Sequence, residues 1–240
     1  MLLIQEYFDM RIPMAVVVCL VSLSALDIVL PRAFGDAVVY TLAADTSSVD
    51  GQSGYIDIQF DPGFQTTQSA FASISNLSTD ANLDPLSVQI SGDVSGALPA
   101  GVTIGNGTQF NDYFEGLIFG NRLSFTLSLS GPALVSPDGS AASGSTFGVG
   151  FYDSTAVNPI LTTNVTDGFA AVVNVNLDGT TTPIAYPSGT GGGAPAIGIS
   201  AVPEPSSISM LLVGLGFSVV FWCRKIGLSK YFRGSFHFSN

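Results

Sequence analysis

Four residue types are missing from most of this 240-residue chain. Between residues 36 and 201 there is no histidine, cysteine, lysine or tryptophan; the two cysteines are Cys19 and Cys223, and the single tryptophan is Trp222. Without histidine, cysteine and lysine, this region cannot form Ser-His-Asp or Cys-His nucleophilic systems, a Schiff base or an ordinary zinc site. It cannot form a disulfide either, so its stability must come from sheet pairing and a hydrophobic core.

Positive charge is almost absent from the same region. It contains fourteen acidic residues and one basic residue, Arg122, so its formal net charge is −13. Neutralising phosphates takes clustered lysine and arginine, so this balance excludes nucleic acid and anionic lipid surfaces as partners. The acidic residues are expected to keep the region soluble.

The C-terminal part holds the most specific pattern. A proline-bracketed acid precedes an apolar run and a basic pair; the residues are Val202, Pro203, Glu204, Pro205, the run 206–222, Arg224 and Lys225. A bilayer core of about 30 Å needs roughly 17 to 25 apolar helical residues, so the run reaches the lower limit for a single transmembrane helix. The basic pair places the C-terminal end in the cytoplasm, and the prolines keep the box extended outside. An ordinary single-pass anchor is the alternative.

This order of a Pro-Glu-Pro box, an apolar run and a basic cluster resembles the PEP-CTERM sorting signal of Gram-negative bacteria. The resemblance covers residues 202–225. It implies an exosortase, a membrane-embedded cysteine protease-transpeptidase, as a partner that handles the box. It also implies transient anchoring in the inner membrane, followed by a place at the cell surface or outside the cell. Residues 226–240 would form a cytoplasmic tail, longer than usual, which an extended or mis-terminated reading frame would explain.

The N-terminal part has the features of a secretory signal peptide. Arg11 precedes an apolar stretch over residues 12–26, and a small-residue cleavage site follows. These features predict a signal peptide over residues 1–35. Translation from Met10 would remove two acidic residues that precede Arg11. A retained N-terminal helix is the alternative.

Between the two signals, the pattern predicts one mainly β domain, an antiparallel β-sandwich over residues 36–186. In residues 122–130, leucine and phenylalanine alternate with serine and threonine with a strict period of two, which is typical of a half-buried strand. Similar alternation predicts strands over residues 38–43, 55–60, 71–75, 86–90, 146–152 and 171–177. Turn-forming residues separate these segments, and seven or more such strands favour two packed antiparallel sheets.

Two segments depart from this pattern. Residues 110–119 are the one segment for which the pattern leaves a short helix open. Residues 187–201 are rich in glycine, proline and serine, which predicts a flexible linker between the domain and the membrane.

The exported region also resembles a family of PEP-CTERM proteins whose ectodomain has no assigned activity. The residues that carry this resemblance are 51–60, 92–99 and 123–134. The resemblance supplies no catalytic residue. We therefore expect an exosortase-sorted structural protein of the cell surface or extracellular matrix, without catalytic activity and delivered together with exopolysaccharide.

Carboxylate chemistry is the enzymatic class that the composition leaves open. Glycoside hydrolysis needs two acids about 5 to 9.5 Å apart, and the pairs that are close in sequence are Asp57 with Asp61 and Asp112 with Glu115. Such pairs are expected by chance among fourteen acids, so no catalytic residue is predicted. Calcium suits oxygen ligands and is left open as a bound ion, but there is no D-x-D-x-D-G loop, so no metal-binding residue is assigned and no other cofactor is predicted.

The alternative function is that of a carbohydrate-binding module for exopolysaccharide. Sugar-binding sandwiches present aromatic rings on a face or in end loops. The available rings are Tyr55, Phe64, Tyr113, Phe114, Tyr152 and Tyr186. The lack of tryptophan in the region weakens this alternative, and most of these rings are expected to pack in the core or in turns.

Overall fold

The computed structural model describes residues 37–189 and 193–202. The predicted signal peptide (1–35), transmembrane run (206–222) and tail (226–240) therefore lie outside the described residues and stay predictions. Within residues 37–189 and 193–202, no helix has both the length and the apolar character that a bilayer crossing requires.

The described residues form strands and short turns almost throughout. The strands are β1 (Val38–Asp45), β2 (Ser53–Pro62), β3 (Phe71–Thr79), β4 (Asn82–Ser91), β5 (Val94–Ala97), β6 (Gly101–Gly105), β7 (Asp112–Ile118), β8 (Arg122–Ser130), β9 (Ser145–Asp153), β10 (Pro159–Ile160), β11 (Phe169–Val175), β12 (Thr181–Ala185) and β13 (Ile197–Ala201). A 3-10 turn, η1 (Ser47–Val49), follows β1, and a four-residue helix, α2 (Pro132–Val135), follows β8.

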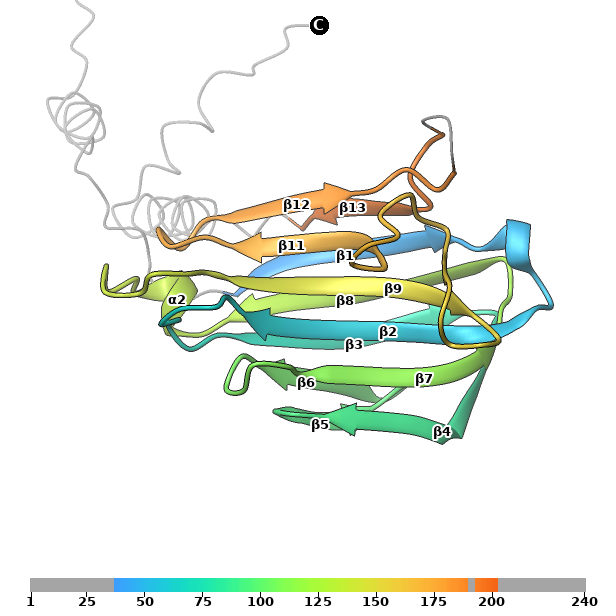
Figure 1. The fold of residues 1–240 in the computed structure, drawn as a ribbon, viewed down its shortest axis with the longest axis horizontal. Coiled ribbons are helices and arrows are strands. Elements are labelled where there is room, and N and C mark those ends of the chain that lie inside the picture. The colour runs from blue at the N-terminus through green and yellow to red at the C-terminus, as the bar shows by residue number, and fades with distance from the viewer. Residues whose placement is uncertain (1–36, 190–192, 203–240) are drawn as a thin grey trace, which may run out of the picture. The chain divides into compact units, whose positions relative to one another are not determined.

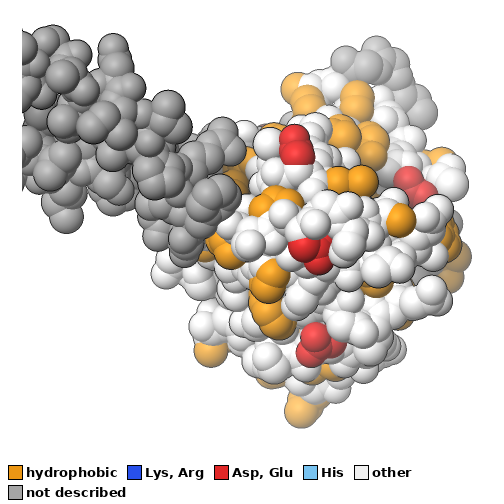
Figure 2. Space-filling view, turned by 90° about the vertical axis from the view of Figure 1, so that its left-hand side faces the viewer, with side chains coloured by type: hydrophobic (Ala, Val, Ile, Leu, Met, Phe, Trp, Pro, Cys, Tyr) orange, Lys and Arg blue, Asp and Glu red, His pale blue; other side chains and the backbone are white. Residues whose placement is uncertain are grey.

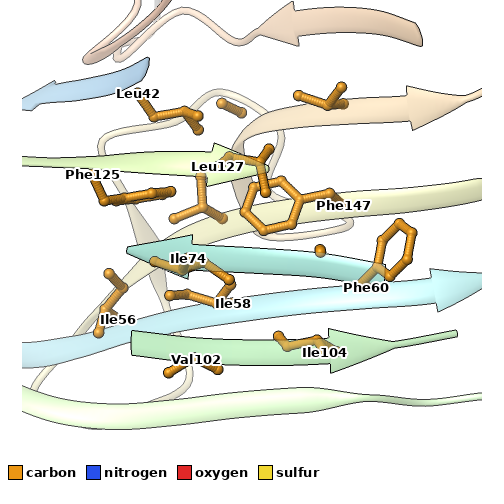
Figure 3. Close-up of a cluster of buried hydrophobic side chains, with 14 of the residues drawn as sticks. Leu42, Ile56, Ile58, Phe60, Ile74, Val102, Ile104, Phe125, Leu127 and Phe147 are labelled. Atoms are coloured by element: carbon orange, nitrogen blue, oxygen red, sulfur yellow. The ribbon is translucent and has the colours of Figure 1, made fainter. Parts of the chain in front are cut away.

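Two antiparallel sheets make up the domain (Figure 1). Sheet A has the strand order β13-β1-β8-β3-β6-β5, and sheet B has the order β12-β11-β9-β2-β7-β4, with β10 paired to β9. Side chains from both sheets form one hydrophobic cluster, in which Phe125 and Leu127 of sheet A lie close to Ile58 and Phe147 of sheet B (Figure 3). The predicted antiparallel β-sandwich is confirmed.

The strand predicted over residues 122–130 is β8, which lies between β1 and β3. Its four apolar side chains are buried, and the hydroxyl side chains that alternate with them are half-buried. The other six predicted strands overlap β1, β2, β3, β4, β9 and β11. The alternation is complete in β8 and clear in β1, whereas in β11 both faces are buried and in β4 most side chains are exposed.

The short helix that the pattern left open over residues 110–119 does not form. Residues Asp112–Ile118 form β7, which pairs with β2 on one side and with β4 on the other. Tyr113 and Leu117 face the core, while Asp112 and Phe114 lie half-buried on the opposite face. Because both faces of β7 carry large or partly buried side chains, the period of two is hidden.

The flexible linker predicted over residues 187–201 is wrong in its C-terminal part. Ile197–Ala201 form β13, an edge strand whose five residues pair antiparallel with β1, from Tyr40–Ala201 to Ala44–Ile197. Ile197 is 1% exposed and belongs to the core. A five-residue strand with one fully buried side chain, next to a glycine run, gives too little alternation to be recognised.

The core position of β8 leads to a paired stability test. Phe125 is 3% exposed, so Phe125→Ala should lower the free energy of unfolding by about 3 to 5 kcal/mol. Thr126 lies on the opposite face of the same strand, and Thr126→Ala should cost less than about 1 kcal/mol. Denaturant unfolding of both variants measures the difference. Equal losses on the two faces would contradict the assignment of β8.

Candidate functional site

The sandwich ends where the proline-bracketed box begins. β13 ends at Ala201, and the backbone N–H of Val202 donates a 2.9 Å hydrogen bond to the carbonyl of Val39 in β1. The edge of sheet A thus continues through Val202. The remaining predicted residues of the box and the basic pair, Pro203, Glu204, Pro205, Arg224 and Lys225, lie outside the described residues.

A second candidate lies on the outer face of sheet B. Alternation along β2 turns Ile56, Ile58 and Phe60 into the core and leaves the alternate side chains, among them those from Tyr55 to Asp61, on the outer face. The strand registers place three side chains from β7 and β9 beside them. The outer-face group comprises Tyr55, Asp57, Gln59 and Asp61 from β2, Asp112 and Phe114 from β7, and Tyr152 from β9.

Three of these side chains form what we call the ring cluster: Tyr55, Phe114 and Tyr152. The Tyr55 and Phe114 rings are stacked, with centroids 4.8 Å apart and planes 17° apart. The Phe114 and Tyr152 rings are tilted at 59°, with centroids 6.0 Å apart. Offset stacked and tilted pairs are favoured geometries for aromatic side chains. The ring cluster therefore forms a preorganised apolar strip across three strands.

The other three rings named from the sequence are elsewhere. Tyr113 is fully buried on the core side of β7, Phe64 is fully exposed in the loop after β2, and Tyr186 is half-buried after β12. The expectation that most of the six rings pack in the core or in turns is therefore only partly right, since three of them meet on one outer face.

A carboxyl pair lies beside the ring cluster. Asp57 is 4% exposed and is hydrogen-bonded to Asp112, and the Gln59 side-chain amide donates to both Asp57 oxygens at 3.1 and 2.9 Å. Burial first, and then the negative charge of Asp112, raise the pKa of Asp57 to about 8. Burial also raises the pKa of Asp112. At neutral pH the pair therefore shares one proton.

The acidic residues that come together in the structure are not the pairs that are close in the sequence. Asp57 and Asp61 share the outer face of β2, but Asp61 accepts a 2.7 Å hydrogen bond from the backbone N–H of Asn111. Asp112 and Glu115 lie on opposite faces of β7, because residues three apart in a strand point to opposite sides. The pair that forms, Asp57 with Asp112, joins two strands whose register the sequence does not reveal.

A groove of about 400 Å³ borders the ring cluster. We call it the Tyr55 groove; its lining includes Tyr55, Asn82, Asp84, Ser87, Gly116 and Ser154. Gly116 keeps the floor open, because a Cβ there would lie 2.7 Å from Ser87 Oγ and 3.4 Å from the Tyr55 ring. The Gly116 N–H donates a 2.7 Å hydrogen bond to the same Ser87 oxygen. One aromatic side chain and several hydroxyl, amide and carboxylate groups therefore meet in one groove.

Sequence reasoning missed Asn82, Asp84, Ser87 and Gly116 as lining residues of this groove. They come from β4 and β7, and only the pairing of these strands brings them beside Tyr55. A signal for Gly116 could have been its place within a run of large side chains, where a glycine marks close approach.

Figure 2 shows acidic side chains, and no lysine or arginine among the described residues, on one face of the molecule.

Comparison with known proteins assigns the C-terminal pattern. Residues 201–225 match the family model of the PEP-CTERM protein-sorting motif. The predicted PEP-CTERM signal is therefore confirmed, and the motif implies an exported protein with exosortase as its processing partner. No curated protein and no solved structure is significantly similar to the chain. The resemblance of the exported region to an ectodomain family, and the roles of single residues in the box, stay predictions.

The carboxyl pair predicts a pH dependence of stability. The ordinary pKa of an aspartate is 3.8, and that of folded Asp57 is about 8. Between these values the folded chain holds a proton that the unfolded chain releases, so the free energy of unfolding falls as pH rises, by about 1.4 kcal/mol per pH unit for one such group. Stability from this group is complete below pH 4 and lost above pH 8.

Asp57→Asn tests whether the Asp57–Asp112 pair shares a proton, because the asparagine side-chain amide can donate a hydrogen bond to Asp112 but does not titrate. Denaturant unfolding at pH 5 and pH 8 should show a clear loss of stability in the unsubstituted chain and a smaller loss in the variant. Asp153→Asn is the matched control, because Asp153 is an exposed acid at the end of β9 whose pKa is lowered to about 2. An unsubstituted chain that is as stable at pH 8 as at pH 5 would contradict a shared proton.

Proposed function

We propose that this protein is an exosortase-sorted structural protein of the cell surface or extracellular matrix and that its sandwich has no catalytic role. The observation that carries this proposal is the direct continuity of the sandwich with the sorting motif. The motif begins at residue 201, which is also the last residue of the edge strand β13. The sorting motif therefore begins at the residue where the last strand of the sandwich ends.

Each part of the chain has a place in the proposed delivery. A signal peptide over residues 1–35 directs export, a helix over residues 206–222 anchors the chain in the inner membrane, and the basic pair holds the helix there. The exosortase then acts on the box. Because β13 supplies Ile197 to the core, a cut after Val202 leaves the whole sandwich in the mature protein.

The chemistry of the described domain supports a non-catalytic role. Its acidic side chains have no histidine, cysteine or lysine partner between residues 36 and 201. The two carboxyls that meet, Asp57 and Asp112, are in hydrogen-bond contact. Glycoside hydrolysis instead keeps its two carboxyls about 5 Å or more apart, with the sugar between them.

A second candidate function, binding of exopolysaccharide, is favoured by the Tyr55 groove. Ligand sites combine apolar and aromatic surface with a few placed polar groups. The groove offers the Tyr55 ring, the Asp84 carboxylate and the Asn82 amide within one open depression of the sheet face. These groups suit a sugar ring, which presents C–H groups on its faces and hydroxyl groups at its edge.

The sorting proposal predicts the fate of a chain with an altered box. Glu204→Ala, or replacement of Pro203-Glu204-Pro205 by Ser-Gly-Ser, should leave the protein inserted in the inner membrane but unprocessed, because insertion needs only the apolar run. Intact mass after fractionation of the native host reads the result. The unsubstituted protein should lack the signal peptide and end before residue 206.

Ser200→Ala serves as the control, since Ser200 is exposed in β13 and close to the box. This variant should be processed like the unsubstituted protein. A surface-located protein that still carries Trp222 and the residues up to Asn240 would show that the segment is only an anchor.

The second candidate has its own test. Pull-down of the mature protein with exopolysaccharide from the same host should be saturable, and Tyr55→Ala should weaken it about tenfold or more, as loss of a central aromatic contact does. Tyr186→Ala is the matched control, because Tyr186 is also half-buried but is absent from the groove lining. Absence of saturable binding would remove this candidate and leave the structural role.

A further inference from the structure

A second pocket, of about 480 Å³, adjoins the Tyr55 groove and is lined by residues of both sheets. Sheet A contributes Leu77 of β3 and Leu98 after β5, and sheet B contributes Leu83 of β4 and Glu115 of β7. We call this space the Glu115 pocket. Most of its lining is apolar, and Glu115 is its one acidic residue. It lies on the side of β7 opposite to the Asp57–Asp112 pair.

The Glu115 carboxyl has one satisfied oxygen and one unsatisfied oxygen. Glu115 is fully buried, and its Oε2 accepts a 2.7 Å hydrogen bond from the Tyr113 hydroxyl. That hydroxyl accepts a 3.1 Å hydrogen bond from the backbone N–H of Leu98. Tyr113 has a single hydroxyl hydrogen and donates it to Oε2, so it cannot serve the other oxygen. Glu115 Oε1 is buried and has no hydrogen-bond partner among the described residues.

An unpaired buried carboxylate oxygen needs an explanation, because leaving such an acceptor without a donor is costly. The neighbouring polar groups do not supply the donor. The Thr79 hydroxyl, which also lines the pocket, donates to the carbonyl of Arg122 and accepts from the N–H of Ala81. A ligand that carries a hydrogen-bond donor at one end would satisfy Oε1.

The negative charge around the pocket determines which ligands could donate a hydrogen bond to Glu115 Oε1. The negative charge of Asp84 acts on Glu115, and Arg122 is the single basic residue between residues 36 and 201. An anionic ligand would be repelled, and an apolar ligand would leave Oε1 unpaired. A calcium ion needs six to eight oxygen ligands, which one carboxyl within an apolar lining does not provide.

We propose that the Glu115 pocket binds a small organic cation, namely a protonated primary amine with an apolar body. The ammonium group donates to Glu115 Oε1, and the apolar body lies against Leu77, Leu83 and Leu98. Tyr113 is a positioning residue, because its hydrogen bond occupies Oε2 and leaves Oε1 without a hydrogen-bond partner among the described residues. The Glu115 pocket shares Asn82 and Leu83 with the Tyr55 groove, but Glu115 itself lines only the former, and the site does not depend on the sorting motif.

The test uses the full-length chain in non-ionic detergent and three probes of the same size: n-butylammonium, n-butanol and butyrate. Ligand-observed saturation-transfer spectroscopy should show saturable binding of n-butylammonium, about tenfold or more tighter than that of n-butanol, as expected for a hydrogen bond to a charged group. Butyrate should not bind. Glu115→Gln should remove the preference for the amine, because it keeps the shape of the side chain and removes its charge.

Asp57→Asn is the matched control, since it removes a buried carboxyl from the other face of the same sheet and should leave amine binding unchanged. If Glu115→Gln does not fold, Ala81→Leu decides the question by narrowing the pocket without touching the carboxyl, and should weaken n-butylammonium binding. Equal affinities for the amine and the alcohol, no saturable binding, or a crystal structure with only a water molecule on Oε1 at saturating amine would each overturn the proposal.

Discussion

The packing of alternate apolar side chains between the two sheets is the interaction on which the rest of the structure depends. No cysteine lies between residues 36 and 201, and the single basic residue there is Arg122, so neither disulfides nor an ion-pair network can hold the domain together. Phe125 and Leu127 of β8 belong to the same buried cluster as Phe147 of β9, and Leu127 lies beside Phe147 (Figure 3). Because the core uses only the inner faces, the outer face of sheet B is free to carry the ring cluster and the Tyr55 groove.

The scarcity of basic residues also explains how buried acids are accommodated. A buried carboxylate is usually paired with a basic group or changes its protonation. Here Asp57 shares a proton with Asp112, Asp61 accepts from the Asn111 N–H, and Glu115 accepts from Tyr113. These partners are neutral or acidic, so burial is the largest cause of the raised pKa of each of these carboxyls.

The sequence predicted the sandwich and its clearest strand because β8 needs only one apolar face, and its alternation is complete. It failed at β7, where Tyr113 packs inside and Phe114 outside, and at β13, which has one fully buried aliphatic side chain. The aromatic residues could be named from the sequence. Which of them lie side by side depends on the register of β2 with β7 and β9, which the sequence does not reveal. The sorting motif could be predicted because it is a contiguous pattern that needs no tertiary contact.

Continuity between the sandwich and the sorting motif is the central claim, and hydrogen exchange in the mature protein tests it most directly. The N–H of Val202 donates to Val39, and β13 pairs with β1 along its whole length. The hydrogen-bonded amides of residues 197–202 should therefore exchange slowly, as those of β8 do, because they open only with the edge of the sheet. Exchange of these amides at the rate of an unstructured peptide would contradict the continuity of sandwich and motif, and would show that residues 197–202 belong to a flexible linker.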